Sequence, residues 1–241
     1  EYRVGPDGSL QLTTSRLPVS VNLGDCPSSF NVTYGLGNDF TGPEVLRLRD
    51  GSYLATLALV WAGSNKLSPH HYPQLSVAAF RSTNGRRWEY ASVIANASDF
   101  PWSVYGPQEN DMALLADGKT IVCLLRMDGD GGCPYHDEPG LYKNYYASFS
   151  TDAGSSWSRP SPVEGAGCVR PRLLQLGTQG RGPLVLAGGR MCTENTSGLF
   201  LWENPDGKAR FDARTGTSSG GPWGVRHDIS HWHNRLAPPS W

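Results

Sequence analysis

Acidic and basic residues at the ends of apolar segments are the side chains in this 241-residue sequence best suited to chemistry. Glu109 stands just before the segment NDMALLADGKTIVCLLR, and Arg126 closes that segment. Arg190 closes another apolar segment, PLVLAGGR. A carboxyl group can take part in proton transfer, and guanidinium groups bind carboxylates in a paired, oriented way. These three residues are the candidate site residues of the sequence. A surface Glu and two strand-end Arg residues without any ligand would leave the same pattern.

Other charged and metal-binding residue types give weaker signals. Arg170 and Arg172 begin a strand, where a solvated or ion-paired Arg is the commoner outcome. Residues 128–132 read DGDGG but lack the later ligands of a calcium loop, so we interpret them as a loop. A histidine cluster near the end of the sequence has no carboxylate or Cys at a recognised metal-site spacing, so we expect it to be structural. Its members are His227, His231 and His233. We therefore expect no metal site.

The elements that would position these residues are short strands joined by tight turns. The chain holds 29 Gly and 18 Pro, which is too many turn formers for a helical bundle, and its 38% apolar content is too high for a disordered chain. Three segments each combine an apolar stretch, a Gly-containing turn and a second apolar stretch: residues 43–61, 110–127 and 170–190. The first two turns are Asp-Gly pairs, which favour β-hairpins. A multi-strand antiparallel unit that recurs in this way is typical of a β-propeller blade. A β-sandwich and a β-solenoid are the alternatives, but neither needs the same turn chemistry in successive units.

A second kind of turn follows each hairpin. Residues 150–157, STDAGSSW, match the pattern S-x-D-x-G-x-x-W at every position. Residues 82–88 are a version shortened by one position, with Asn84 in place of Asp, and residues 204–211 are a degraded third copy. We expect the Asp or Asn to cap backbone amides of the turn, the Gly to take a positive φ, and the Trp to pack between sheets. These turns are predicted to be structural rather than catalytic.

The turns resemble the Asp boxes, or BNR repeats, of sialidases. Sortilin-type receptors and plant photosystem assembly factors also carry such boxes, so the box indicates an architecture rather than an activity. Pro43 before the first apolar strand, Glu109 before the second hairpin and the Gly-Cys pair before the third together resemble the exo-α-sialidases over about residues 40–211. The resemblance implies an all-β, sialidase-like β-propeller, six-bladed in the family, in which residues 1–241 form a single domain.

The resemblance also implies a function: hydrolysis of terminal sialic acids on glycoproteins or glycolipids, without a cofactor, in an Arg-lined cleft at the propeller axis. Sialidases use a Tyr nucleophile, activated by a neighbouring Glu. On this basis Glu109 would polarise the Tyr, while Arg126 and Arg190 would bind the carboxylate of the substrate.

Two departures from the family pattern favour an alternative. Thr41 stands where the first Arg of the family's F-R-I-P motif belongs. Residues 65–74, where the family has its acid/base Asp, contain no carboxylate, so a stand-in would be needed. The candidates are His70, His71, Tyr72 and Asp99. The alternative is a catalytically impaired propeller that binds glycans or serves as a protein-interaction scaffold.

Roughly four blades fit the length, so we expect a propeller that is incomplete at its C-terminus, with the nucleophilic Tyr encoded beyond Trp241.

The sequons at Asn31, Asn96 and Asn195 favour a secreted or lysosomal-type luminal protein. A net charge of −1 gives no broad basic field for nucleic acid, and no apolar run reaches the ~20 residues of a transmembrane segment.

Overall fold

The chain is described here from a computed structural model, which places residues 2–4, 10–12, 20–22, 45–60, 74–103, 105–127, 145–163, 166, 169–176, 182–193, 196–205, 207, 211–212, 217–218 and 227–228. These residues form β-strands and one 3-10 helix, Ala97–Asp99. The predicted all-β class is therefore confirmed for the described part of the chain. In that part, no helix has the length and hydropathy to cross a membrane.

The strands form three larger sheets, each an antiparallel meander in chain order. The first sheet contains β4 (Val45–Arg47), β5 (Tyr53–Val60), β6 (Leu75–Ser82) and β7 (Arg87–Ala95), with β3 (Ser20–Asn22) parallel to β7. The second sheet contains β8 (Asn110–Leu114), β9 (Ile121–Leu125), β10 (Tyr146–Ser150) and β11 (Ser161–Pro162). The third sheet contains β12 (Val169–Gln175), β13 (Leu184–Thr193), β14 (Thr196–Asn204) and β17 (His227–Asp228). Two small hairpins are β1 (Tyr2–Val4) with β2 (Leu10–Leu12), and β15 (Phe211–Asp212) with β16 (Thr217–Ser218).

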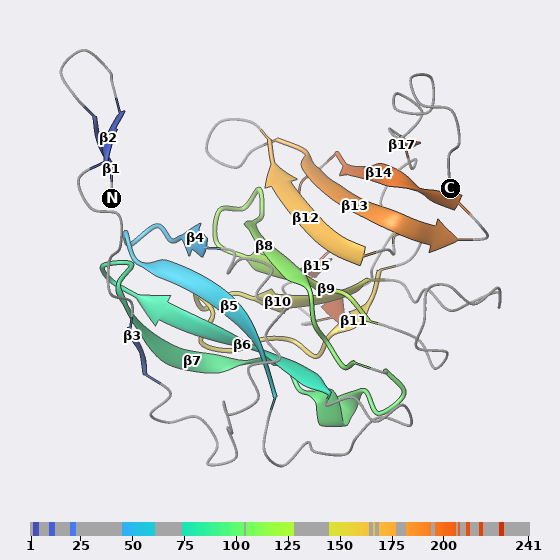
Figure 1. The fold of residues 1–241 in the computed structure, drawn as a ribbon, viewed down its shortest axis with the longest axis horizontal. Helices are drawn as coiled ribbons and strands as arrows, with labels where there is room; N and C mark the ends of the chain where they lie inside the picture. The colour runs from blue at the N-terminus through green and yellow to red at the C-terminus, as the bar shows by residue number, and fades with distance from the viewer. Residues whose placement is uncertain are drawn as a thin grey trace.

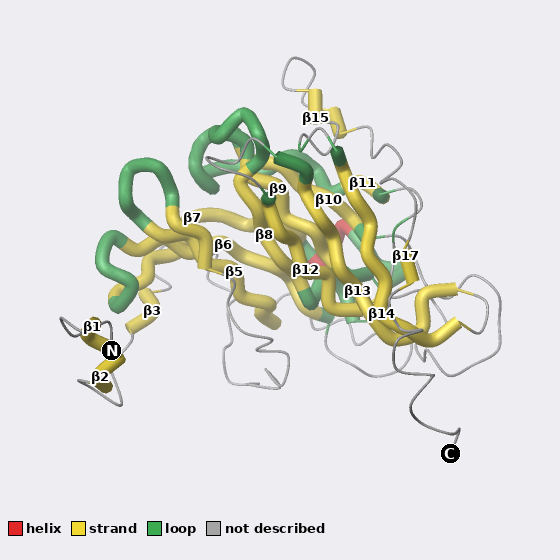
Figure 2. Tube along the Cα trace, turned by 90° about the horizontal axis from the view of Figure 1, so that it is seen from above, coloured by secondary structure: helices red, strands yellow, loops and turns green. Residues whose placement is uncertain are grey.

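The three sheets stand side by side (Figures 1 and 2) with their first strands as neighbours. Strand β8 contacts both β4 and β12, so the first strand of each sheet lies on one common side of the assembly. Successive meanders arranged in this way have the geometry of propeller blades. The described strands form three such meanders, so the six-bladed count stays a prediction.

The apolar core lies between the sheets and explains why the middle strands are so hydrophobic. All five residues of β9, sequence IVCLL, are buried. Alternate residues of a strand point to opposite faces. Ile121 and Leu125 accordingly pack into the cluster shared with the first sheet, which includes Leu54. Leu124 packs on the other side, in the cluster that includes Trp202 of the third sheet. The second sheet is therefore covered on both faces.

The tight hairpin turns have the predicted chemistry. Gly51 and Gly118 adopt φ values of 84° and 64°, which only glycine takes readily. Asp117 Oδ1 accepts the backbone N–H groups of Lys119 and Thr120, both at 2.8 Å. The turn between β8 and β9 is thus fixed by its own side chain, and it marks one end of these strands. Glu109 lies at the other end.

The second kind of turn also caps itself as predicted. Asp152 Oδ1 accepts the N–H of Ser156 at 2.9 Å, and Gly154 has a φ of 84°. A β-carbon on Gly154 would lie 2.7 Å from Leu54, because this turn of the second sheet presses against the first sheet. The indole of Trp157 donates to Ser92 of β7 at 3.1 Å, which ties the two sheets together.

The shorter copy shows the same capping: Asn84 Oδ1 accepts the N–H groups of Arg86 and Arg87, both at 2.9 Å. In the degraded third copy, Gly207 keeps a positive φ of 60°, whereas Asp206 lies outside the described residues.

Candidate functional site

Glu109 and Arg126 are cross-strand neighbours at the open end of the β8–β9 hairpin. The N–H of Arg126 donates to the carbonyl of Glu109 at 2.9 Å, so the hydrogen-bond ladder continues past the last strand residues. Side chains of directly opposed residues lie on the same face of the sheet. Arg126 Nη1 and Glu109 Oε2 form an ion pair of 2.9 Å, and the two side chains are only 11% and 8% exposed. The hairpin itself therefore assembles a buried acid–base pair.

Arg170 joins this pair from the third sheet. Its backbone N–H donates to Glu109 Oε2 at 2.7 Å, and its Nε lies 3.5 Å from Glu109 Oε1. The pairing of β12 with β13 shifts register between Val169 and Arg172, and Arg170 in this bulge has a φ of 48°. Such a conformation is strained for a residue with a β-carbon. The hydrogen bond to Glu109 helps to hold the bulge in place.

We call Glu109, Arg126 and Arg170 the Glu109 cluster. Guanidinium groups stay protonated at all ordinary pH values, so two positive charges face one carboxylate. Arg170 is 62% exposed, and in the described part of the chain its terminal Nη atoms donate no hydrogen bond. The cluster thus carries a surplus positive charge whose accessible portion belongs to Arg170. This arrangement is suited to binding an anionic group that approaches from solvent.

Asp111 is a second buried carboxylate on β8, and it has a structural task. Its Oδ2 accepts the N–H of Leu173 in β12 at 2.7 Å, and its Oδ1 accepts the N–H of Met112 at 2.7 Å. Together, Glu109 and Asp111 hold the bulged start of β12 against β8. The sequence analysis did not predict a role for Asp111. The available signal is an Asp within an apolar segment, because a buried Asp is rare unless it has a partner.

The backbone places Arg190 at the same end of the third sheet as Arg170. Strand pairing sets Gly189 opposite Val169, so Arg190 follows at the end where β12 begins. Strand β12 lies beside β8. The backbone of Arg190 is therefore at the same end of the sheets as the Glu109 cluster. The structure describes only the backbone of Arg190, so its substrate-binding role remains a proposal. Arg172 is exposed further along β12.

The charges of Glu109 and Arg126 affect the pKa of Tyr145, but this residue is buried. Burial raises the pKa of its hydroxyl far above the usual value, the negative charge of Glu109 raises it further, and the positive charge of Arg126 opposes these effects. Tyr145 is completely buried and packs edge-on against Trp202, with ring centroids 6.3 Å apart. A completely buried tyrosine cannot reach a substrate, so it does not fit the role of a nucleophile. The predicted nucleophile is therefore not Tyr145.

Most of the remaining sequence candidates lie outside the described residues. Thr41, His70, His71 and Tyr72 lie outside the described residues, as do residues 128–132, His231 and His233. Asp99 is exposed in the 3-10 helix and makes no ion pair with the cluster. His227 belongs to β17, opposite Leu201. Among the described residues, no group of three His, Cys, Asp or Glu could hold a metal ion.

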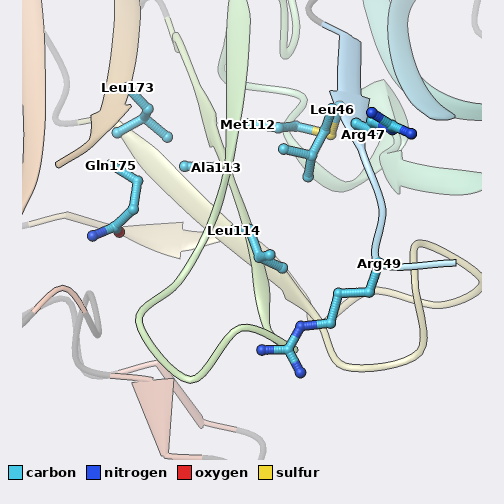
Figure 3. Close-up of a pocket in the computed structure, with 8 residues that line it drawn as sticks. All are labelled: Leu46, Arg47, Arg49, Met112, Ala113, Leu114, Leu173 and Gln175. Atoms are coloured by element: carbon cyan, nitrogen blue, oxygen red, sulfur yellow. The ribbon is translucent and has the colours of Figure 1, made fainter. Parts of the chain in front are cut away.

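A cavity of about 670 Å³ lies between the first strands of the three sheets (Figure 3). It is lined from β8 by Met112 and its two successors, from β12 by Leu173 and Gln175, and on the side of β4 by Leu46, Arg47 and Arg49. These residues lie toward the Asp-Gly turns, and the guanidinium of Arg49 lies against Gly118. The cavity is mostly apolar and separate from the Glu109 cluster. We place the candidate site at the cluster, because it combines a buried carboxylate with two guanidinium groups, one of them exposed, whereas the cavity carries exposed arginines without an acidic partner in its lining.

Comparisons with known proteins give structural likeness only. No known protein family and no curated protein matches the chain. The chain is similar to a NanB sialidase from Streptococcus pneumoniae, with 15% identity, a TM-score of 0.46, and coverage of 77% of this chain and 23% of that one. It is also similar to an α-L-arabinofuranosidase from Fusarium graminearum, with 16% identity, a TM-score of 0.49, and coverage of 77% and 47%. An α-L-arabinanase from Penicillium chrysogenum shows 15% identity, a TM-score of 0.45, and coverage of 68% and 45%. The chain spans less than half of each of these proteins.

Proposed function

We propose that this chain is part of a β-propeller glycoside hydrolase that removes terminal sialic acids from glycoproteins or glycolipids. The observation that supports this most is the Glu109–Arg126 ion pair, buried at the open end of an inner hairpin and joined there by the exposed Arg170. An excess of guanidinium over carboxylate suits a sugar that carries its own carboxylate. The proposal includes a secreted or lysosomal-type luminal location, which the sequons support.

The proposed roles combine the family resemblance with the contacts of the Glu109 cluster and the backbone position of Arg190. Arg126 and Arg190 bind the carboxylate of the sialic acid, and Arg170 adds a donor at the solvent-exposed edge of the same site. Glu109 orients Arg126 and polarises a Tyr nucleophile. That nucleophile is a tyrosine other than Tyr145. Hydrolysis of this kind proceeds through an oxocarbenium-like state and needs no cofactor.

A propeller that binds sialylated glycans without turnover is the second candidate. Both oxygens of Glu109 already have partners, at 2.9 and 2.7 Å for Oε2 and 3.5 Å for Oε1. A carboxylate held in this way is less available to activate a nucleophile. Thr41 in the place of the family's first Arg favours the same alternative. A protein-interaction scaffold without glycan binding is the remaining possibility.

Turnover of a fluorogenic α-sialoside by the full-length protein, with any residues that the gene encodes beyond Trp241, distinguishes these functions. Release of the fluorophore, lost in Arg126→Ala but kept in Lys119→Ala, is the result expected for the hydrolase. Lys119 is a suitable control because it is exposed at the opposite end of the same hairpin. Binding of the sialoside without release would support the second candidate, and absence of both would contradict both. Arabinosides and xylosides in the same assay test whether the negative charge of the sugar matters.

A further inference from the structure

The sequon Asn96-Ala97-Ser98 has a defined conformation, whereas Asn31 and Asn195 lie outside the described residues. Asn96 follows β7 and is the N-cap of the 3-10 helix Ala97–Asp99. Its Oδ1 accepts two hydrogen bonds of 3.0 Å, one from the N–H and one from the hydroxyl of Ser98. The segment is anchored by the N–H of Ala97, which donates to the buried Ser76 hydroxyl at 2.9 Å.

The other side-chain atom of Asn96, Nδ2, is not used by the fold. Among the described residues, none accepts a hydrogen bond from Asn96 Nδ2. N-glycosylation substitutes this nitrogen and leaves Oδ1 in place. The cap on Ser98 would therefore survive the modification. Ser98 and Asp99 are exposed and Asn96 is half-buried, so the amide stands at the surface of the first sheet.

A groove of about 560 Å³ begins at Asn96 and runs between the first and second sheets. Asp99 lines it beside Asn96, and Trp157 and Arg159 line it from the second sheet. The Trp157 indole N–H is bonded to Ser92, which fixes the plane of the ring. An aromatic ring packs on the apolar face of a sugar, and the flanking Asp and Arg can bind its hydroxyl and acetamido groups.

We propose that Asn96 carries an N-linked glycan and that its first N-acetylglucosamine occupies the groove against Trp157. The donor is an oligosaccharide linked to a lipid pyrophosphate. Nδ2 of Asn96 forms a bond to C1 of the sugar as the bond from C1 to the pyrophosphate oxygen breaks. Nδ2 loses one proton, and the lipid pyrophosphate leaves with the electron pair. This inference is independent of the Glu109 cluster.

Secretion of the whole chain from a eukaryotic host, with a reporter sequon in an appended tag, tests the attachment. Peptide mapping after enzymatic deglycosylation in heavy-oxygen water should show conversion of Asn96 to labelled Asp. Ser98→Ala should abolish labelling at Asn96 while keeping the backbone N–H that Asn96 caps. Ser98→Thr should retain the labelling. An unlabelled Asn96 in a chain whose reporter sequon is labelled would overturn the proposal.

The position of the sugar has its own readout. Trimming to a single isotope-labelled N-acetylglucosamine should give nuclear Overhauser contacts between its acetyl methyl group and an indole ring. Those contacts should disappear in Trp157→Phe and persist in Trp88→Phe. Trp88 is the matched control because its indole N–H donates to Gly85 in the corresponding turn of the first sheet. Labelling at Asn96 without any contact to Trp157 would overturn the seating in the groove.

Discussion

The backbone N–H of Arg170 donates to the buried carboxylate of Glu109 at 2.7 Å, across the boundary between the second and third sheets. Arg170 makes this contact with a φ of 48°, inside a bulge of β12. A side chain that the resemblance assigns to catalysis thus also fixes the backbone of its neighbour. Structure and proposed chemistry depend on the same carboxylate, and substitutions can separate the two contributions.

Arg170→Gly and Arg170→Ala separate backbone strain from charge. Both remove the guanidinium, so both should weaken sialoside binding equally. Only glycine takes a φ of 48° without steric strain, so Arg170→Gly should be more stable to urea than Arg170→Ala by about 1 kcal/mol. Equal unfolding free energies for the two variants would show that the positive φ is not a source of strain.

Glu109 should be more sensitive to truncation than to loss of charge. Glu109→Ala leaves the largely buried Arg126 without a partner and removes the acceptor for Arg170, so we expect a loss of about 3 to 5 kcal/mol in the free energy of unfolding. Glu109→Gln keeps an acceptor and should lose less than half as much. Urea denaturation followed by circular dichroism measures both. A Glu109→Ala variant within about 1 kcal/mol of the wild type would contradict the role of this carboxylate in joining the sheets.

Asp111 should affect stability without affecting ligand binding. Asp111→Ala leaves the N–H groups of Leu173 and Met112 without their acceptor, at an expected cost of about 1 to 3 kcal/mol. At temperatures where the variant remains folded, its sialoside affinity should match that of the wild type, because the hydrogen bonds that the Asp111 carboxylate accepts hold backbone N–H groups of β8 and β12. A selective loss of affinity would mean that the start of β12 transmits changes to the site.

Acid should weaken the self-capped turns. Burial alone would raise the pKa of Asp152, but hydrogen bonds from the side chain and backbone of Ser156 and from Ser150 outweigh it, and the pKa falls below the usual 3.8. A depressed pKa in the folded state contributes stability above the unfolded pKa, and that contribution is lost as the pH falls through the folded pKa. Urea midpoints measured between about pH 5 and pH 3 should therefore decline.

Asp152→Asn is the matched variant for this acid effect. Asn84 occupies the same position in the shorter turn and caps it with an uncharged Oδ1. The variant should keep most of its stability at neutral pH and show a shallower decline in acid than the wild type. An identical acid profile would assign the effect to other carboxylates.

Much of the fold could be predicted from the sequence because its signals are local. The Asp-Gly pairs at Asp50 and Asp117 predict the hairpins. In each pair the Asp side chain accepts a backbone N–H of the turn, and the Gly that follows it takes the positive φ. The capping by Asn84 and Asp152 follows from the spacing within one turn. The continuous burial of β9 follows from its unbroken apolar run.

The site could be predicted only in part, because its contacts join residues distant in sequence. Glu109 and Arg126 are brought together by a predictable hairpin, and their pairing follows from its register. The contact between Glu109 and Arg170 spans 61 positions and depends on a bulge at a residue other than glycine, for which the sequence gives no local signal. Complete burial of Tyr145 likewise follows from the packing of the third sheet onto the second.

Calorimetric titration of the whole chain with an α-methyl sialoside and with its carboxyl methyl ester tests the central claim most directly. The ester keeps the sugar ring but removes the negative charge that the Glu109 cluster is proposed to bind. We predict that the acid binds at least about tenfold more tightly than the ester, a difference of about 1.4 kcal/mol, and that Arg126→Ala abolishes the difference. Equal affinity for acid and ester, or a preference unchanged in Arg126→Ala, would contradict the account.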